Sequence, residues 1–129
     1  MGEAAAKKGD EITASDTHIE IIPGPPPVPT PFTHDYKGII DGELSADVNI
    51  AGMPAAVEGS TSTNTPPHIP KSAPFQSPPS NKGTIKKGSQ TVKINGKGAA
   101  RNGDMAETCN DPSDMPVGTV KATGTVNIG

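Results

Sequence analysis

The sequence predicts an all-β fold: a small cone of short β-hairpins with pseudo-threefold symmetry and long proline-rich loop insertions. Three observations predict it. A hairpin pattern with an Asn-Gly turn occupies residues 88–104, a close copy occupies residues 46–60, and each end of the chain carries one half of the same pattern.

The clearest hairpin signal lies at residues 88–104, GSQTVKINGKGAARNGD. Val92 and Ile94 alternate with polar neighbours, as in a strand with one buried face. Asn95-Gly96 is a strong turn signal because both turn residues must adopt positive φ. The second arm, 99–101, carries small residues that allow close approach of neighbouring chains, so we expect a short hairpin here.

Residues 46–60, ADVNIAGMPAAVEGS, repeat this pattern. The N-terminus holds only the second arm and the C-terminus only the first, so pairing of the two ends would complete a third unit and a threefold ring. The three units would then be related by pseudo-threefold symmetry. The equivalent residues are Val48, Val92 and Val126; Ile50, Ile94 and Ile128; Ala5-Ala6, Ala55-Ala56 and Ala99-Ala100; and Gly9, Gly59 and Gly103.

The composition leaves little material for an apolar core. Hydrophobic residues make up 31% of the 129 residues and aromatic residues 2%, with 15 Gly and 15 Pro. Such a chain needs a metal, a disulfide or a partner to become ordered. The single cysteine excludes an intramolecular disulfide.

Charge and hydropathy exclude several classes of protein. The net charge is −3 and Lys and Arg are spread along the chain, so there is no footprint for nucleic acid. The N-terminal residues lack an apolar signal region, and no apolar run reaches the length of a membrane span. We therefore expect a soluble protein that is made in the cytoplasm and does not leave by the general secretory route.

The side chains best suited to bind a metal are His18, His34, His68 and Cys109. Imidazole and thiolate groups are the usual ligands of tetrahedral structural zinc, although the wide spacing of these four gives no support by itself. The repeat does give support, since His18 follows Asp10 at the same interval as His68 follows Ser60. Solvent-exposed histidines and a small buried cysteine are the alternative interpretation.

The segment GSQTVKINGKGAARNGD closely resembles the signature of PAAR-repeat proteins. The tetrapeptide behind that name stands here as Pro54-Ala55-Ala56-Val57 and Gly98-Ala99-Ala100-Arg101, and the resemblance covers about half of the chain. It implies a sharp β-cone on the blunt end of a trimeric β-helix spike, in type VI secretion systems and related phage-tail-like contractile machines. In such a cone we expect the three short hairpins to converge to a point while the broad base meets the threefold partner. It also implies one structural Zn²⁺ near the vertex, bound by three His and one Cys, for which His18, His34, His68 and Cys109 are the candidates.

The resemblance further implies partners and a location. One chain would cap a homotrimeric spike protein of the valine-glycine repeat type through its base, contact a target membrane transiently, and bind no nucleic acid. It would assemble in the bacterial cytoplasm and, on firing, reach the outside or the target cell at the tip of the particle. Since the repeat runs to Gly129, we expect an effector cargo to be carried separately.

We expect a single domain over residues 1–129, with insertions at about 20–41 and 61–83. Residues 23–31, PGPPPVPTP, favour a polyproline II loop packed on the cone or its base, with a ligand for an aromatic groove as the alternative. Residues 66–82 are similar in composition and are expected to form a surface loop.

These features favour a zinc-stabilised, membrane-piercing tip that is not an enzyme. The first alternative is a small zinc hydrolase, which would need an open coordination position that four protein ligands do not leave. The second is a proline-rich interaction or adaptor protein, which composition supports and the hairpin repeat opposes.

Overall fold

The computed structural model describes residues 2–129 and contains strands but no helix in that range, which confirms the all-β prediction. It also contains no helix of the length and apolar character needed to span a membrane within those residues. The strands are β1 (Glu3–Ala4), β2 (Glu11–Ile22), β3 (Val28–Gly42), β4 (Asn49–Ile50), β5 (Met53–Pro54), β6 (Thr61–Asn64), β7 (Lys82–Ile85), β8 (Lys93–Ile94), β9 (Lys97–Gly98), β10 (Met105–Thr108), β11 (Met115–Lys121) and β12 (Asn127–Ile128).

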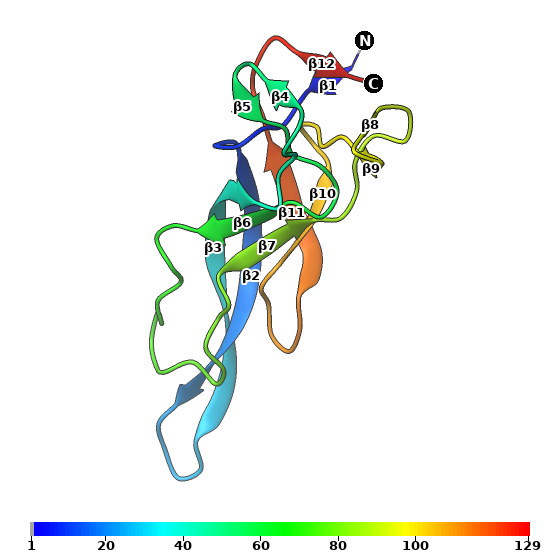
Figure 1. Cartoon of the computed structure of the whole chain (residues 1–129). Helices are drawn as coiled ribbons and strands as arrows, with labels where there is room; N and C mark the ends of the chain where they lie inside the picture. The colour runs from blue at the N-terminus through cyan, green and yellow to red at the C-terminus, as the bar shows by residue number, and fades with distance from the viewer. Residues whose placement is uncertain (1) are drawn as a thin grey trace.

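A closed antiparallel barrel of β10, β11, β2, β3, β6 and β7 forms the middle of the molecule (Figure 1). Alternate residues of each strand point inward, and the fully buried side chains include Ile12, Ile40, Ile85 and Val120. The hydroxyl of Tyr36, also buried, lies 2.6 Å from the Ser62 hydroxyl. Closure leaves these six strands without a free edge around the barrel, which suits a chain with a small apolar core.

The narrow end of the molecule is the far part of the β2–β3 hairpin (Figure 1). These strands pair continuously from Glu11↔Ile39 to Ile22↔Val28, and residues 23–27 connect them. Two expectations are therefore wrong. The short hairpins do not form the point, and residues 28–31 form a strand and not a polyproline II loop.

Prolines fit into β3 because of their spacing. Their pairing partners on β2, Ile19 and Ile21, donate their N–H groups away from β3, to Asp111 Oδ2 and to the Pro74 carbonyl. Pro31 and Pro29 therefore occupy positions at which β3 needs no N–H to bond β2. The alternation of proline with other residues, which suggested a loop, is compatible with a strand paired on one side.

Three two-stranded sheets form the broad end, where both termini lie (Figure 1). β4 pairs with β5, β8 with β9, and β1 with β12, so the two ends of the chain pair with each other. The three pairs use equivalent residues of the sequence repeat. Ile50, Ile94 and Ile128 are each 7–8% exposed and pack with small alanines in one cluster.

A cyclic set of hydrogen bonds joins the three units at their centre. The N–H of Ala6 donates to the carbonyl of Ala100, Ala100 donates to Ala56, and Ala56 donates to Ala6, at 2.9, 3.0 and 3.0 Å. These three alanines have no exposed surface. A larger side chain has no room at this point, which explains the Ala-Ala pairs in the repeat.

Glycine ends each unit because the chain turns there with positive φ. Gly9, Gly59 and Gly103 have φ of 95°, 95° and 91°, values that side chains rarely tolerate. Their N–H groups donate to the carbonyls of Ile40, Ile85 and Val120 at 2.8–3.0 Å. The three turns therefore attach the broad end to the barrel at equivalent places.

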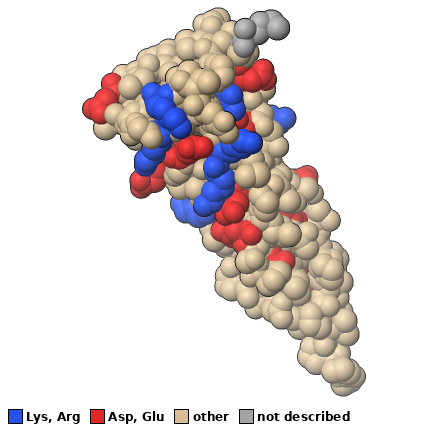
Figure 2. Space-filling model, turned by 90° about the vertical axis from the view of Figure 1, so that its right-hand side faces the viewer, with Lys and Arg blue, Asp and Glu red and all other residues tan. Residues whose placement is uncertain are grey.

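On the face shown in Figure 2, charged side chains gather over the broad half of the molecule and are sparse over the tapered half. Residues 21–33 contain no Asp, Glu, Lys or Arg. Residues 65–81, between β6 and β7, contain no strand and lie along β2, where Phe75 forms an isolated bridge with Glu20.

Candidate metal centre

The predicted ligands come from four different segments. His18 lies on β2 and His34 on β3, while His68 lies in the loop 65–81 and Cys109 directly follows β10. His18, His34 and Cys109 are 1–4% exposed, and the His68 side chain is 3% exposed. All four side chains point into the same region, where the barrel narrows toward the β2–β3 hairpin.

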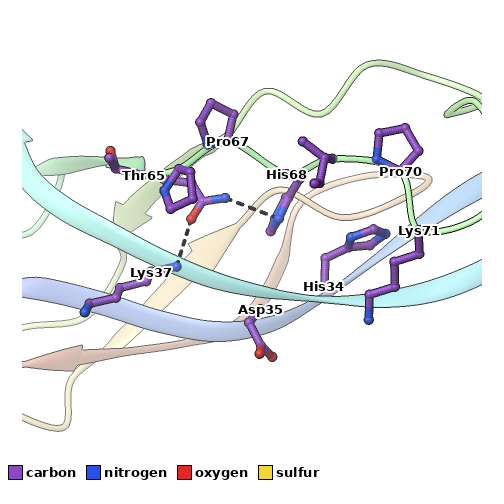
Figure 3. Close-up of a pocket in the computed structure, with 11 residues that line it drawn as sticks. His34, Asp35, Lys37, Thr65, Pro67, His68, Pro70 and Lys71 are labelled. Carbon is purple, nitrogen blue, oxygen red and sulfur yellow. Dashed lines mark hydrogen bonds between the residues drawn. The ribbon is translucent and has the colours of Figure 1, made fainter.

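The three imidazole rings lie next to one another. Ring centroids are 5.0 Å apart for His18 and His68, 5.4 Å for His34 and His68, and 5.8 Å for His18 and His34. Figure 3 shows the rings of His34 and His68 side by side. Residues that are distant in the sequence are thus brought to one place by the hairpin and by the loop.

Four donor atoms form the tightest group: one each from Asp16, His18, His68 and Cys109, all within 4.8 Å of one another. The donors of His34 lie outside this group, although its ring is adjacent. The sequence analysis missed Asp16. The available signal was its position two residues before His18, which places both side chains on the same face of a strand.

Asp16 has no exposed surface and accepts hydrogen bonds on both oxygens. Its Oδ2 lies 2.9 Å from Nε2 of His68 and 3.5 Å from Sγ of Cys109. Its Oδ1 accepts from the Thr108 hydroxyl and, at 3.5 Å, from the Asn110 amide. The same carboxylate oxygen thus contacts two candidate ligands, His68 and Cys109, and holds them near each other.

The orientation of His68 is fixed by Asn64. The Asn64 side-chain oxygen accepts the Lys37 N–H at 2.9 Å, so its amide nitrogen faces Nδ1 of His68 at 3.2 Å (Figure 3). Nδ1 is therefore the acceptor, and Nε2 carries the proton shared with Asp16. A metal at this site would take the place of that proton.

Buried nitrogen atoms without a hydrogen-bond partner point to a missing ligand. Among residues 2–129 these atoms are Nδ1 and Nε2 of His18 and Nε2 of His34. A carboxylate oxygen of Asp111 lies 3.6 Å from Nδ1 of His18 and one of Glu20 lies 3.2 Å from Nε2 of His34, but neither contact has the geometry of a hydrogen bond. Leaving such a group unpaired costs about 1–3 kcal/mol. Native structures rarely tolerate this without an ion or a water molecule, so the residues present fit a bound cation.

The protonation states suit a soft divalent cation. Burial lowers the pKa of His18 and of His34 below the ordinary value, which keeps their imidazoles neutral and able to coordinate. Burial, with Asp16 beside it, raises the pKa of the Cys109 thiol to about 11. A metal must therefore displace the thiol proton, which links its affinity to pH.

A pocket of about 540 Å³ opens beside the cluster and is lined by His34 and His68 (Figure 3). Pro66, Pro67, Ile69 and Pro70 of the loop form its apolar wall, and Lys37 and Lys71 stand at it as well. The pocket therefore lies against two of the histidines, whose side chains are 3–4% exposed.

In a comparison with known protein families, residues 76–129 match the family model for the PAAR motif. The matched segment includes β7 through β12, the Gly98-Ala99-Ala100-Arg101 tetrapeptide and Cys109. No curated protein matches the chain. The match confirms the resemblance inferred from the sequence and supports a protein of the spike tip of contractile injection systems.

Proposed function

We propose that this PAAR-motif chain is a single-domain tip for the spike of a contractile injection machine, clamped by one structural zinc ion. Its broad end would sit on a trimeric β-helix spike protein of the valine-glycine repeat type, and the β2–β3 hairpin would enter the target membrane first. This role is structural and involves no catalysis.

The observation that carries the proposal is the threefold hydrogen-bond pattern of the broad end. The cyclic bonds among Ala6, Ala56 and Ala100 make one chain resemble three equivalent units at that surface. Three equivalent valines, Val48, Val92 and Val126, are 36–43% exposed. A monomer with this arrangement can match the end of a homotrimer at three places at once.

The narrow end supports the piercing role. Residues 21–33 contain no Asp, Glu, Lys or Arg, and the carboxylate of Glu20, which precedes them in the sequence, has no exposed surface. Charged side chains are costly in the hydrocarbon region of a bilayer, so an uncharged tip lowers the barrier to entry. The continuous β2–β3 pairing leaves the hairpin stiff over its whole length.

The metal would stiffen the part of the molecule that bears the load. His18, His34, His68 and Cys109 remain the proposed ligands, with Asp16 as a further donor within reach. Structural zinc contributes about 10–16 kcal/mol of apparent binding free energy in small peptides. Since whole domains are stable by about 5–15 kcal/mol, zinc would decide whether the loop and the hairpin act as one body.

Copurification with the trimeric spike protein tests the proposal, with two exposed valines as a matched pair. Val92→Asp at the broad end should abolish binding to the spike, whereas Val117→Asp on the barrel strand β11 should leave it intact. Equal binding by both variants would contradict binding through the broad end. No binding by the wild type would contradict the spike protein as the partner.

The pocket beside His34 and His68 favours a zinc hydrolase as the second candidate, because it would let a substrate approach the metal. A hydrolase needs an exchangeable ligand on the metal. Binding of a small anionic inhibitor to the zinc-loaded protein would support this alternative, and a site that excludes such ligands would support the structural role.

A further inference from the structure

Glu20 is a buried carboxylate that the proposed ligand set does not use. It has no exposed surface, and it lies two residues after His18 on the same face of β2. Asp16, His18 and Glu20 thus alternate along one strand, with a carboxylate on each side of the histidine.

The carboxylate of Glu20 binds the loop 65–81 through three consecutive backbone N–H groups. The N–H groups of Lys71, Ser72 and Ala73 donate to its two oxygens at 2.8, 2.8 and 2.9 Å. Successive N–H groups that converge in this way form a concave binding place for an anion. Two further backbone bonds hold the same stretch to β2, from Ile21 to Pro74 at 2.8 Å and from Gln76 to Ile19 at 2.7 Å.

The same carboxylate lies beside one candidate ligand of the metal and binds the loop that carries another. Its Oε2 lies 3.2 Å from Nε2 of His34. The loop that it binds also carries His68, three residues before Lys71. One buried side chain thus lies beside His34 and also binds the loop that carries His68, whose ring contacts Asn64 and Asp16 as well.

We infer that Glu20 is a positioning residue that couples the proline-rich loop to the metal centre. The inference rests on the proposed metal site and adds that metal binding and the contact between Glu20 and the loop strengthen each other. If the bond between Glu20 and the loop strengthens metal binding by some factor, the metal strengthens that bond by the same factor, because coupling between two equilibria is reciprocal. Residues around metal ligands typically change affinity by about 10–100-fold when they are replaced.

Cobalt(II) affinity of the full chain tests this, since cobalt replaces zinc in tetrahedral sites and absorbs visible light. Glu20→Gln should weaken cobalt binding by about 10–100-fold and alter the absorption bands. The control is Glu11→Gln on the same strand, whose carboxylate is partly exposed and pairs with Lys37 at 3.5 Å. It should bind cobalt as the wild type does.

Hydrogen exchange on the wild-type protein gives a second measurement that needs no variant. The amides of Lys71, Ser72 and Ala73 should exchange about 10–100-fold more slowly in the metal-loaded chain than in the chelated chain, by reciprocity with the affinity change. The amide of Tyr36, in the barrel, should change far less.

The outcomes separate the inference from the proposed function. If the wild type takes up neither cobalt nor zinc, the metal clamp itself is wrong. If the wild type binds cobalt and Glu20→Gln binds it with the same affinity and spectrum, the coupling is wrong. Should Glu20→Gln fail to fold, unchanged exchange at residues 71–73 on metal removal overturns the inference.

Discussion

Nε2 of His68 lies 2.9 Å from Oδ2 of Asp16, which joins a loop without strands to the longest hairpin of the barrel. Asp16 and His68 lie 52 residues apart in the sequence. Through this contact the loop packs on β2 and covers one side of the metal centre.

We expect purified protein to contain about one zinc ion per chain and to lose thermal stability when it is chelated. His18→Ala should lower both zinc content and the unfolding temperature, because His18 has two buried nitrogens without a hydrogen-bond partner. Elemental analysis and a thermal scan measure this. Ser15→Ala, an exposed position on the same strand, is the control. Full zinc content in His18→Ala would contradict ligation by this residue.

Asp16→Asn should weaken zinc binding by about 10–100-fold. An amide cannot accept hydrogen bonds on both of its polar atoms, so the bonds from His68 and Cys109 or those from Thr108 and Asn110 would be lost. A competition titration with a chromogenic chelator measures the affinity. Asp41→Asn, an exposed carboxylate on β3, should bind zinc as the wild type does.

Ala56→Leu should destabilise the fold by about 1–3 kcal/mol, since the cyclic hydrogen bonds at the centre of the broad end leave no volume for a larger side chain. Urea unfolding measures the change. Ala46→Leu places the same side chain at an exposed position before β4 and should change stability by less than about 0.5 kcal/mol. Similar effects of the two substitutions would argue against a tight centre.

Glu58 predicts a specific pH dependence of stability. Its carboxylate accepts the N–H groups of Gly88 at 2.9 Å and Gly98 at 3.3 Å, and the bond from Gly88 is the main reason that its pKa lies below the ordinary value of 4.5. A pKa that is lower in the folded chain than in the unfolded chain stabilises the fold above the unfolded value. That stabilisation is lost as the pH falls through the folded value.

Glu58→Gln should therefore lower the free energy of unfolding by about 1 kcal/mol at pH 7, and its difference from the wild type should shrink below pH 4.5. Urea unfolding at a series of pH values measures this. Glu43→Gln, at an exposed carboxylate, should follow the wild type at every pH. A difference that grows toward acid would reverse the assigned sign.

Local patterns predicted the broad end well. Asn95-Gly96 forms the turn of β8 and β9, with φ of 52° and 81°, and Ala51-Gly52 forms the equivalent turn with 51° and 85°. The pairing of β1 with β12 also follows from the split repeat. These features depend on neighbours in the sequence, so turn chemistry and side-chain size were enough to find them.

The long hairpin could not be predicted in the same way. Proline argues against a strand on local grounds, and residues 28–31 became a strand because their partners on β2 bond to the segments around Asp111 and Pro74. Those segments come from distant parts of the chain. Only the assembled barrel shows that the missing proline N–H groups were not needed.

The sequence by itself determined the threefold repeat, the all-β class and the histidine and cysteine donors, because each of these depends on residue type and short spacing. Tertiary structure decided that β2 and β3 form the narrow end, that Asp16 joins the donors, and that Glu20 anchors the loop. Burial is the physical reason. A carboxylate is a surface group by default. Asp16 and Glu20 are removed from water only because β2 packs against two loops, and those loops supply hydrogen bonds to both carboxylates.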